Sequence, residues 1–155
     1  MTVAEVGRAT RAVTGTTLGA WLLKADPRHA PVEEWLRTDF GTLGTRCVRT
    51  TYRTRLVQEG QPVLLWVSGR DPGFPSGIYA HGHATGPVRV DDESGPVLPL
   101  RLRTTDPMVP RRELLASPEL HHLEVLRLPA GSNPSFIDRN AWHALRELFP
   151  QVTGS

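Results

Sequence analysis

The chain has 155 residues and a net charge of +2, from 18 Lys and Arg residues and 16 Asp and Glu residues. This length fits one domain that buries about two-thirds of its unfolded surface, and no apolar run approaches the roughly 18 to 20 residues of a membrane span. The single cysteine, Cys47, excludes an internal disulfide and a cysteine-based zinc site, so we expect a cytoplasmic protein with no membrane partner.

Residues 1–15 lack an uninterrupted apolar core, and we expect them to form a flexible N-terminal tail rather than a signal peptide. We expect residues 16–150 to form one domain, because no linker divides them. Periodicity and turn residues predict the elements of that domain. In chain order they are a strand over Thr16–Lys24, a helix over Pro31–Phe40, strands over Arg46–Val57, Val63–Ser68, Gly77–Thr85 and Val97–Arg103, a helix over Pro110–Ser117, a strand over Leu123–Leu128 and a helix over Asp138–Phe149. Asp138 is well placed to cap the last helix.

The order of these elements predicts the fold class. Helices are inserted among the strands rather than alternating with them regularly, which favours a mixed α+β domain. We expect a small, strongly bent mixed β-barrel of five to six strands with short helices around it. Gly77, Gly82 and Gly86 suit the sharp curvature and close backbone approach that such a sheet needs.

The apolar run that starts at Val63 ends in Trp66 and Ser68. Its continuous hydrophobicity predicts a strand buried on both faces. Trp66 and Ser68 share one face of that strand, and the loop that follows carries Phe74. An aromatic face beside a small hydroxyl favours a pocket for a planar, hydrogen-bonding ring, although a tryptophan in a buried strand is equally a core residue.

Arginine dominates the basic residues, and Lys24 is the only lysine. Alternation along the strand predicted over Arg46–Val57 puts Arg49, Arg53 and Arg55 on one face, at spacings that follow the phosphates of an extended nucleic-acid strand. A solvated sheet face explains the same pattern. Tyr52 falls on the opposite face, as a core residue or a pocket wall.

The turn before the last helix contains Asn133, whose amide can pair with a base edge, although turns favour asparagine in any case. His81 and His83 share a strand face, but no third metal ligand stands nearby, and a His-x-His pair alone is weak evidence for a metal. No phosphate-binding loop, dinucleotide fingerprint or nucleophile motif occurs. The sequence therefore predicts no metal and no cofactor.

From about Leu18 to Phe149 the order and spacing of these segments resemble the EVE domain family, which belongs to the PUA-like superfamily and is related to YTH and ASCH domains. The resemblance rests on four segments: Gly19–Pro27 with its tryptophan–leucine–x–lysine start, Gln58–Ser68 with a glycine turn and a strand ending in aromatic–x–serine, Gly77–Gly86, and Ser132–Phe136 before a tryptophan-containing helix. Gln61 departs from the family, since many members have an acid there. Residues 49–51 only partly match the valine–arginine–asparagine motif of the eukaryotic-type members.

EVE domains hold a flipped-out, often modified base in an aromatic-lined pocket, and prokaryotic relatives are associated with modification-dependent restriction and RNA modification. The resemblance therefore implies a module that binds DNA or RNA carrying a modified base, without catalysis of its own. Whether a separate effector protein is a second partner stays open. The resemblance implies a base pocket made of Trp21, Trp66, Ser68, Asn133 and Tyr52, and phosphate contacts from Lys24, Arg49 and Arg53.

Two alternatives stand beside this interpretation. One is an ASCH-like ribonuclease that uses Lys24, Tyr52 and His81 around the same pocket. The other is a domain that binds a small molecule or a nucleotide, in which the arginines are incidental. The sequence does not distinguish DNA from RNA or free nucleotide, and it does not identify the base modification.

Overall fold

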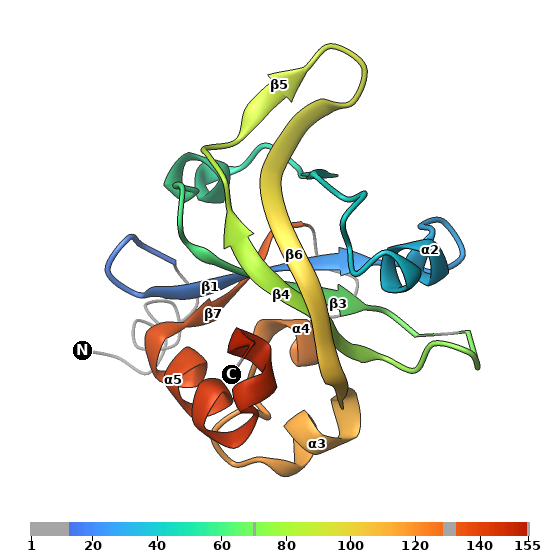
Figure 1. Ribbon diagram of the computed structural model, residues 1–155. Helices are drawn as coiled ribbons and strands as arrows, with labels where there is room; N and C mark the ends of the chain where they lie inside the picture. The colour runs from blue at the N-terminus through green and yellow to red at the C-terminus, as the bar shows by residue number, and fades with distance from the viewer. Residues whose placement is uncertain (1–12, 70, 129–132, 155) are drawn as a thin grey trace.

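The computed structural model describes residues 13–69, 71–128 and 133–154, so most of the tail predicted over residues 1–15 lies outside the described residues. A mixed sheet forms the centre of the molecule, with the strand order β2-β6-β4-β3-β1-β7 and with β5 paired to β6 (Figure 1). The strands are β1 (Leu18–Ala25), β2 (Thr45–Cys47), β3 (Pro62–Val67), β4 (Gly77–Ala84), β5 (Arg89–Asp91), β6 (Gly95–Pro110) and β7 (Ser135–Asp138). The helices are α2 (Val32–Arg37), α3 (Arg111–Ala116), α4 (Glu124–Arg127) and α5 (Arg139–Leu148), with 3-10 turns η1 (Tyr52–Leu56) and η2 (Pro150–Thr153).

The mixed α+β class is confirmed, but the sheet is not closed. Its ladder runs from an edge at β2 to an edge at β7, and the long strand β6 curves strongly across the molecule (Figure 1). The two edges still approach each other beyond the ends of their strands. The amide of Arg49 donates to the carbonyl of Asn133 at 3.0 Å, which joins the segment after β2 to the segment before β7.

Alternating side chains along the central strands build a hydrophobic core on each face of the sheet. On β1, Trp21 and Leu23 enter the first core, whereas Leu22 enters the second. The first core extends to Trp35 on α2. The second core lies between the sheet and the helices α3, α4 and α5, which gather on one side (Figure 1). Among the described helices, none is long and apolar enough to cross a bilayer.

Several predicted elements are confirmed. The strands expected over Val63–Ser68 and Gly77–Thr85 are β3 and β4, and the last helix begins after Asp138, whose side chain accepts a hydrogen bond from the amide of Ala141 at 2.8 Å. The expected close backbone approach is present at Gly82, where a Cβ would collide with the carbonyl oxygen of Arg101. A Cβ at Gly86 would meet only the ring of Pro99 at 3.7 Å, so that position does not need glycine for space.

The strand predicted over Arg46–Val57 is wrong. Only its start belongs to β2, and η1 occupies its second half. Thr51 is the cause, because its hydroxyl accepts from the amide of Arg53 at 3.2 Å, while Thr54 caps the amide of Thr51 in return. Threonines that favour a strand by propensity here act as turn caps. Arg49 and Arg53 therefore do not form a ladder on one strand face.

Two further elements differ from the prediction. The segment Leu123–Leu128 contains the helix α4 rather than a strand, and β7 occurs where a turn was expected. Both segments are short, so periodicity does not separate helix from strand in them. Pairing with β1 decides the second case, since Phe136 lies opposite Trp21 in the antiparallel register.

The side chain of Gln61 accepts the hydrogen bond that the indole N–H of Trp21 donates. The indole is fully buried, and its Nε1 donates to Oε1 of Gln61 at 2.7 Å. The same oxygen accepts from the amide of Gln58, and Nε2 of Gln61 donates to the carbonyl of Leu56. Gln61 thus supplies the acceptor that a buried indole N–H requires.

We predict that Gln61→Leu lowers the free energy of unfolding by about 1 to 3 kcal/mol, because the buried N–H of Trp21 loses its acceptor. Denaturant unfolding measures the loss. Gln58→Leu is the matched control, since Gln58 is exposed, and its effect should stay within about 0.5 kcal/mol. Equal losses in the two variants would show that the indole bond contributes nothing.

Candidate functional site at the sheet seam

Five of the eight predicted site residues gather where the two sheet edges meet, and Ser68 lies next to them, after the central strand β3. We call this group the seam cluster, and it consists of Lys24, Arg46, Arg49, Tyr52, Arg53, Ser68, Glu124, Asn133 and Ser135. These residues come from β1, the segment from β2 to η1, the end of β3, α4 and the start of β7. Trp21 and Trp66 do not belong to it.

Asn133 is the centre of the seam cluster. Its Oδ1 accepts from the amide of Lys24 at 2.8 Å, and its Nδ2 donates to the carbonyl of Lys24 at 3.2 Å. The side-chain amide therefore continues the ladder of β1 past the last paired residue, Ser135. The backbone carbonyl of Asn133 accepts a hydrogen bond from the backbone amide of Arg49. The amide that was predicted to contact a base edge is engaged by backbone.

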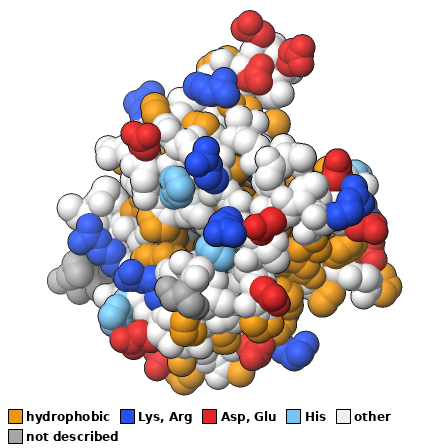
Figure 2. Space-filling model, in the orientation of Figure 1, with side chains coloured by type: hydrophobic (Ala, Val, Ile, Leu, Met, Phe, Trp, Pro, Cys, Tyr) orange, Lys and Arg blue, Asp and Glu red, His pale blue; other side chains and the backbone are white. Residues whose placement is uncertain are grey.

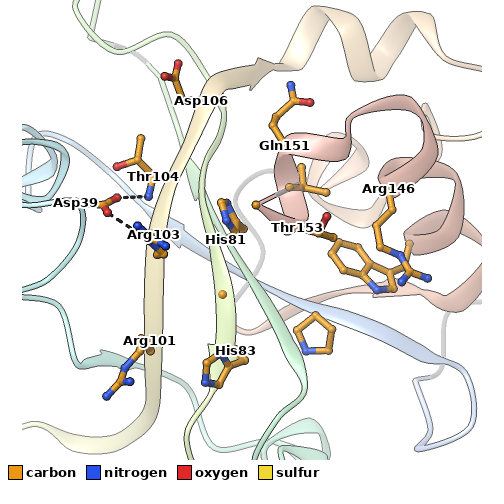
Figure 3. Close-up of a pocket in the computed structure, with 15 residues that line it drawn as sticks. Asp39, His81, His83, Arg101, Arg103, Thr104, Asp106, Arg146, Gln151 and Thr153 are labelled. Atoms are coloured by element: carbon orange, nitrogen blue, oxygen red, sulfur yellow. Dashed lines mark hydrogen bonds and ion pairs between the residues drawn. The ribbon is translucent and has the colours of Figure 1, made fainter.

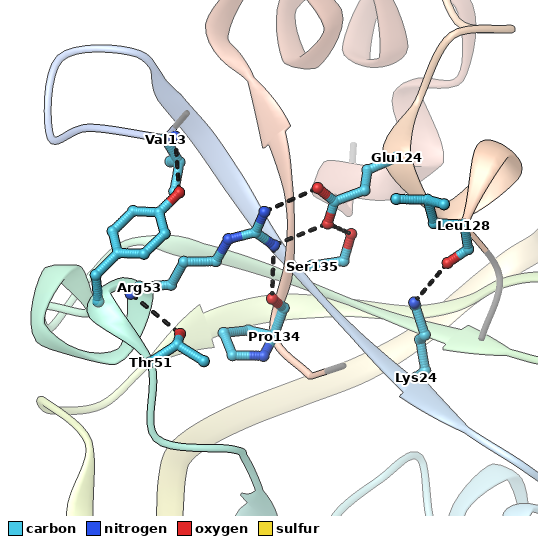
Figure 4. A network of polar contacts seen from close by, with 9 residues as sticks. Val13, Lys24, Thr51, Arg53, Glu124, Leu128, Pro134 and Ser135 are labelled. Atoms are coloured by element: carbon cyan, nitrogen blue, oxygen red, sulfur yellow. Dashed lines mark hydrogen bonds and ion pairs between the residues drawn. The ribbon is translucent and has the colours of Figure 1, made fainter. Parts of the chain in front are cut away.

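A two-pronged ion pair joins Arg53 to Glu124 (Figure 4). Nη1 and Nη2 of Arg53 each donate to a carboxylate oxygen of Glu124 at 2.8 Å, and Nη1 also donates to the carbonyl of Pro134 at 3.1 Å. Ser135 donates to the same carboxylate at 2.8 Å. The guanidinium lies 4.9 Å from the ring centroid of Phe136. Arg53, a predicted phosphate contact, thus has its fork occupied by a carboxylate.

These contacts shift the pKa values of the pair and of Lys24. Burial raises the pKa of Glu124, but the hydrogen bonds from Arg53 and Ser135 outweigh it, so the pKa of Glu124 is lowered from 4.5. The hydrogen bond to Glu124 raises the pKa of Arg53. For Lys24, burial lowers the pKa, nearby Glu124 raises it and Arg53 lowers it, with a net lowering. Its Nζ donates to the carbonyl of Leu128 at 3.1 Å (Figure 4).

Arg46 is a member of the seam cluster that the sequence did not indicate. Its Nη2 donates to the carbonyl of Lys24 at 2.8 Å, and its guanidinium lies 5.4 Å from the ring centroid of Trp35. Burial lowers the pKa of Arg46. Its Nε is buried and makes no hydrogen bond among the described residues. Nothing in the sequence separates Arg46 from the other arginines of this segment.

The predicted aromatic pocket between Trp21 and Trp66 is wrong. Trp21 is 0% exposed and packs in the first core, whereas Trp66 is 2% exposed and packs in the second. In the parallel register Trp21 lies opposite Val63, and Lys24 lies opposite Trp66. The two indoles therefore stand on opposite faces of the sheet. Tyr52 differs from both, because it is 53% exposed.

Ser68 and Tyr52 lie at the margin of the seam cluster. The hydroxyl of Ser68 donates to the carbonyl of Ala25 at 3.2 Å, next to Lys24. The ring of Tyr52 lies 6.0 Å from the guanidinium of Arg53, and its hydroxyl accepts from the amide of Val13 at 3.2 Å.

A separate cavity of about 890 Å³ lies over β4 and β6, against α5 and η2 (Figure 3). His81 lines this cavity, and its Nδ1 is 2.8 Å from the hydroxyl of Thr105. Neither Lys24 nor Tyr52 lines it. The residues of the ribonuclease alternative are therefore not brought together. In the described part of the chain, no group of three or more His, Cys, Asp or Glu side chains is arranged to hold a metal ion.

No protein-family model matches this chain, and no curated protein matches its sequence. Its fold is similar to solved structures. A hypothetical protein from Leishmania major matches with a TM-score of 0.65 and 13% identity, over 90% of this chain and 99% of that one. A protein from Rhodopseudomonas palustris matches with a TM-score of 0.64 and 12% identity, over 86% of this chain and 94% of that one. A protein from Pseudomonas syringae matches with a TM-score of 0.60 and 16% identity, over 83% of this chain and 98% of that one. At these identities the likeness concerns the fold alone.

We predict that Glu124→Gln lowers the free energy of unfolding by about 1.5 to 3 kcal/mol at pH 7, because charge-assisted bonds to Arg53 are lost. The pKa of Glu124 is lowered in the folded protein, so the contribution is present above 4.5 and is lost as the pH falls through the folded value. The difference between wild type and variant should therefore shrink below pH 4.5 in denaturant unfolding. Glu147→Gln, which breaks an exposed pair with His143, should change stability by less than about 0.5 kcal/mol. A pH-independent difference for Glu124→Gln would contradict the assignment.

Proposed function

We propose that this protein is a nucleic-acid-binding module of the EVE type, without catalysis of its own, and that the seam cluster is its binding surface. One observation carries the proposal. Residues from distant parts of the sequence, which the family resemblance implied as ligand contacts, lie together at the seam through the bonds of Asn133 and Arg53. For the fold, we propose a PUA-like bent barrel whose closure is the contact between Arg49 and Asn133. The cytoplasm remains the expected compartment.

The charges of the seam cluster favour a polyanion. Its cationic side chains are Lys24, Arg46, Arg49 and Arg53, and Glu124 is its one carboxylate. Glu124 is paired with Arg53, and the other three cationic side chains belong to the same cluster at the edge of the sheet. Arginine forks match phosphate geometry, and phosphate contacts supply most of the sequence-independent affinity for nucleic acid.

In this proposal the base stacks on the ring of Tyr52, because the rings of Trp21 and Trp66 are buried. Its ring is half exposed, and Arg53 lies beside it with its guanidinium held by Glu124. A base stacked on an aromatic ring gains about 1 to 3 kcal/mol. A base must leave its helix to reach such a ring, so we propose single-stranded or flipped-out DNA or RNA as the ligand. The modified base implied by the family resemblance would be selected by shape at this position, with about 1 to 3 kcal/mol of discrimination for an added methyl or hydroxymethyl group.

The ribonuclease alternative has less support, because His81 lines the separate cavity rather than the seam cluster. A nucleic-acid reader needs no acid–base pair at the seam. An effector protein that acts on the bound nucleic acid is compatible with the proposal but is not required for binding.

We predict that Tyr52→Ala weakens binding of a single-stranded oligonucleotide by about 5- to 150-fold, since the stacking surface is removed. Fluorescence anisotropy with oligonucleotides carrying methylated or hydroxymethylated cytosine, methylated adenine or no modification measures this loss. Tyr52→Phe is the control, because it keeps the ring and removes only the hydroxyl that bonds Val13. Unchanged affinity in Tyr52→Ala would remove Tyr52 from the site.

The phosphate role of Arg49 has a separate test. Arg49→Gln should weaken all oligonucleotides similarly and reduce the slope of log affinity against log salt by about one. Arg89→Gln removes an exposed arginine from β5, outside the seam cluster, and should leave the slope unchanged. The same slope in wild type and Arg49→Gln would contradict a phosphate contact at this residue.

A further inference from the structure

The cavity over β4 and β6 takes no part in the proposed nucleic-acid site. Its floor is the pair of antiparallel strands, and α5 and η2 form a wall (Figure 3). Gly154, at the end of η2, closes over His81, because a Cβ at Gly154 would lie 3.2 Å from Nε2 of that histidine. A volume of about 890 Å³ lies within the range of small-molecule sites, about 300 to 1,000 Å³.

Four nitrogen-bearing side chains line the floor in two cross-strand pairs. His81 lies opposite Arg103, and His83 lies opposite Arg101. Directly opposed residues of antiparallel strands have Cβ atoms about 4.5 to 5.5 Å apart, and residues two apart on a strand share a face. The strand register therefore builds a square of two imidazoles and two guanidinium groups. In Figure 2, Lys, Arg and His side chains gather over the centre of this face.

The positive charge at one end of this square is not neutralised. Arg101 is exposed and forms no ion pair among the described residues. Arg103 has an exposed partner, Asp39, at 3.4 Å, and the other oxygen of Asp39 accepts from the amide of Thr104. Asp106 lines the far end of the cavity, five residues along β6 and thus about 16 Å of extended chain from Arg101.

The wall adds a further cation. Arg146 of α5 lines the cavity, and its guanidinium lies 5.2 Å from the ring centroid of Trp142. Trp142 is 7% exposed, so its ring serves to hold Arg146 rather than to stack on a ligand. His81, at the centre of the floor, is held by its contact with Thr105. Arg146 and His81 are thus positioned by the fold before any ligand arrives.

We propose that this cavity binds a small molecule that carries a phosphate monoester, with the phosphate at Arg101, His83 and Arg103. Guanidinium forks donate two parallel hydrogen bonds to a phosphate, and the imidazole of His83 adds a donor. The far end of the cavity, near Asp106 and Gln151, takes the uncharged part of the ligand. The wall formed by α5 and η2 suits a single small molecule better than a continuous nucleic-acid strand. This site lies beyond the proposed function of the seam cluster and does not depend on it.

The test is calorimetric titration of the full chain with ribose 5-phosphate, adenosine 5′-monophosphate, inorganic phosphate and adenosine. We expect the two monoesters to bind at one site, inorganic phosphate to compete with them, and adenosine not to bind. Arg101→Gln should weaken monoester binding by at least about tenfold, since one charge-assisted contact is lost. Arg112→Gln, which removes an exposed arginine of α3 outside the cavity, should bind as the wild type does.

Arg101 is exposed, so the fold should survive its replacement, and thermal unfolding of Arg101→Gln checks this. Tyr52→Ala should bind the monoesters normally, which separates this site from the seam cluster. The proposal is overturned if no phosphate-bearing probe binds, if adenosine binds as well as its monophosphate, or if Arg101→Gln binds unchanged. It is also overturned if Arg101→Gln impairs oligonucleotide binding while the monoesters do not bind, because the cavity then belongs to a nucleic-acid surface.

Discussion

The bonds between the side chain of Asn133 and the backbone of Lys24 are the constraint on which the seam depends. Beyond the last residue paired with β7, the amide and carbonyl of Lys24 on β1 have no backbone partner in β7. The side-chain amide of Asn133 bonds to both groups. Its backbone carbonyl accepts from the amide of Arg49, in the segment that follows the opposite edge. Asn133 thus bridges two edges that do not form a common ladder, and Arg46 of β2 adds a second bridge through its bond to the carbonyl of Lys24. Unpaired edge groups are costly when they are half-buried, so this geometry is strongly specified.

Arg53 spans from η1 to α4 and to the carbonyl before β7, so it links the seam to the second core's helices. Burial disfavours each charge singly, and the two-pronged geometry with a further bond from Ser135 compensates for it. The same arrangement holds the positive charge of the cluster near the exposed ring of Tyr52. The bonds that hold the seam together and the proposed ligand contacts therefore involve the same residues.

The cavity on β4 and β6 follows from a different feature, the register of two neighbouring strands. Pairing of His81 with Arg103 and of His83 with Arg101 places four similar side chains on one face. Gly82 between the histidines lets β6 approach closely, since any side chain there would meet the backbone of Arg101. The helix α5 and the turn η2 then convert a sheet surface into a hollow. The two proposed sites are thus built by separate parts of one sheet.

Much of the fold follows from local sequence. The buried strand before Ser68, the glycine-bounded strand β4 and the cap of Asp138 on α5 depend on hydrophobic runs, turn residues and hydrogen bonds within a few positions. The mixed α+β class follows from their order. Residue patterns and the resemblance to EVE domains had singled out Lys24, Ser68 and Asn133, which the structure places in the seam cluster.

The conformation of some segments, and the side chains that meet at each site, were decided only by the tertiary structure. Threonine caps turned a predicted strand into η1, and pairing with β1 made a strand of the segment after Pro134, because short runs take their conformation from their partners. The sequence shows that Trp21 and Trp66 lie in apolar or alternating runs, but the face each one occupies depends on the register between β1 and β3. Arg46 and the cavity on β4 and β6 had no sequence signal, since both arise from contacts between residues far apart in the chain. Local sequence determines which elements form when the stabilising bonds are local, and the long-range pairing of strands determines which side chains meet.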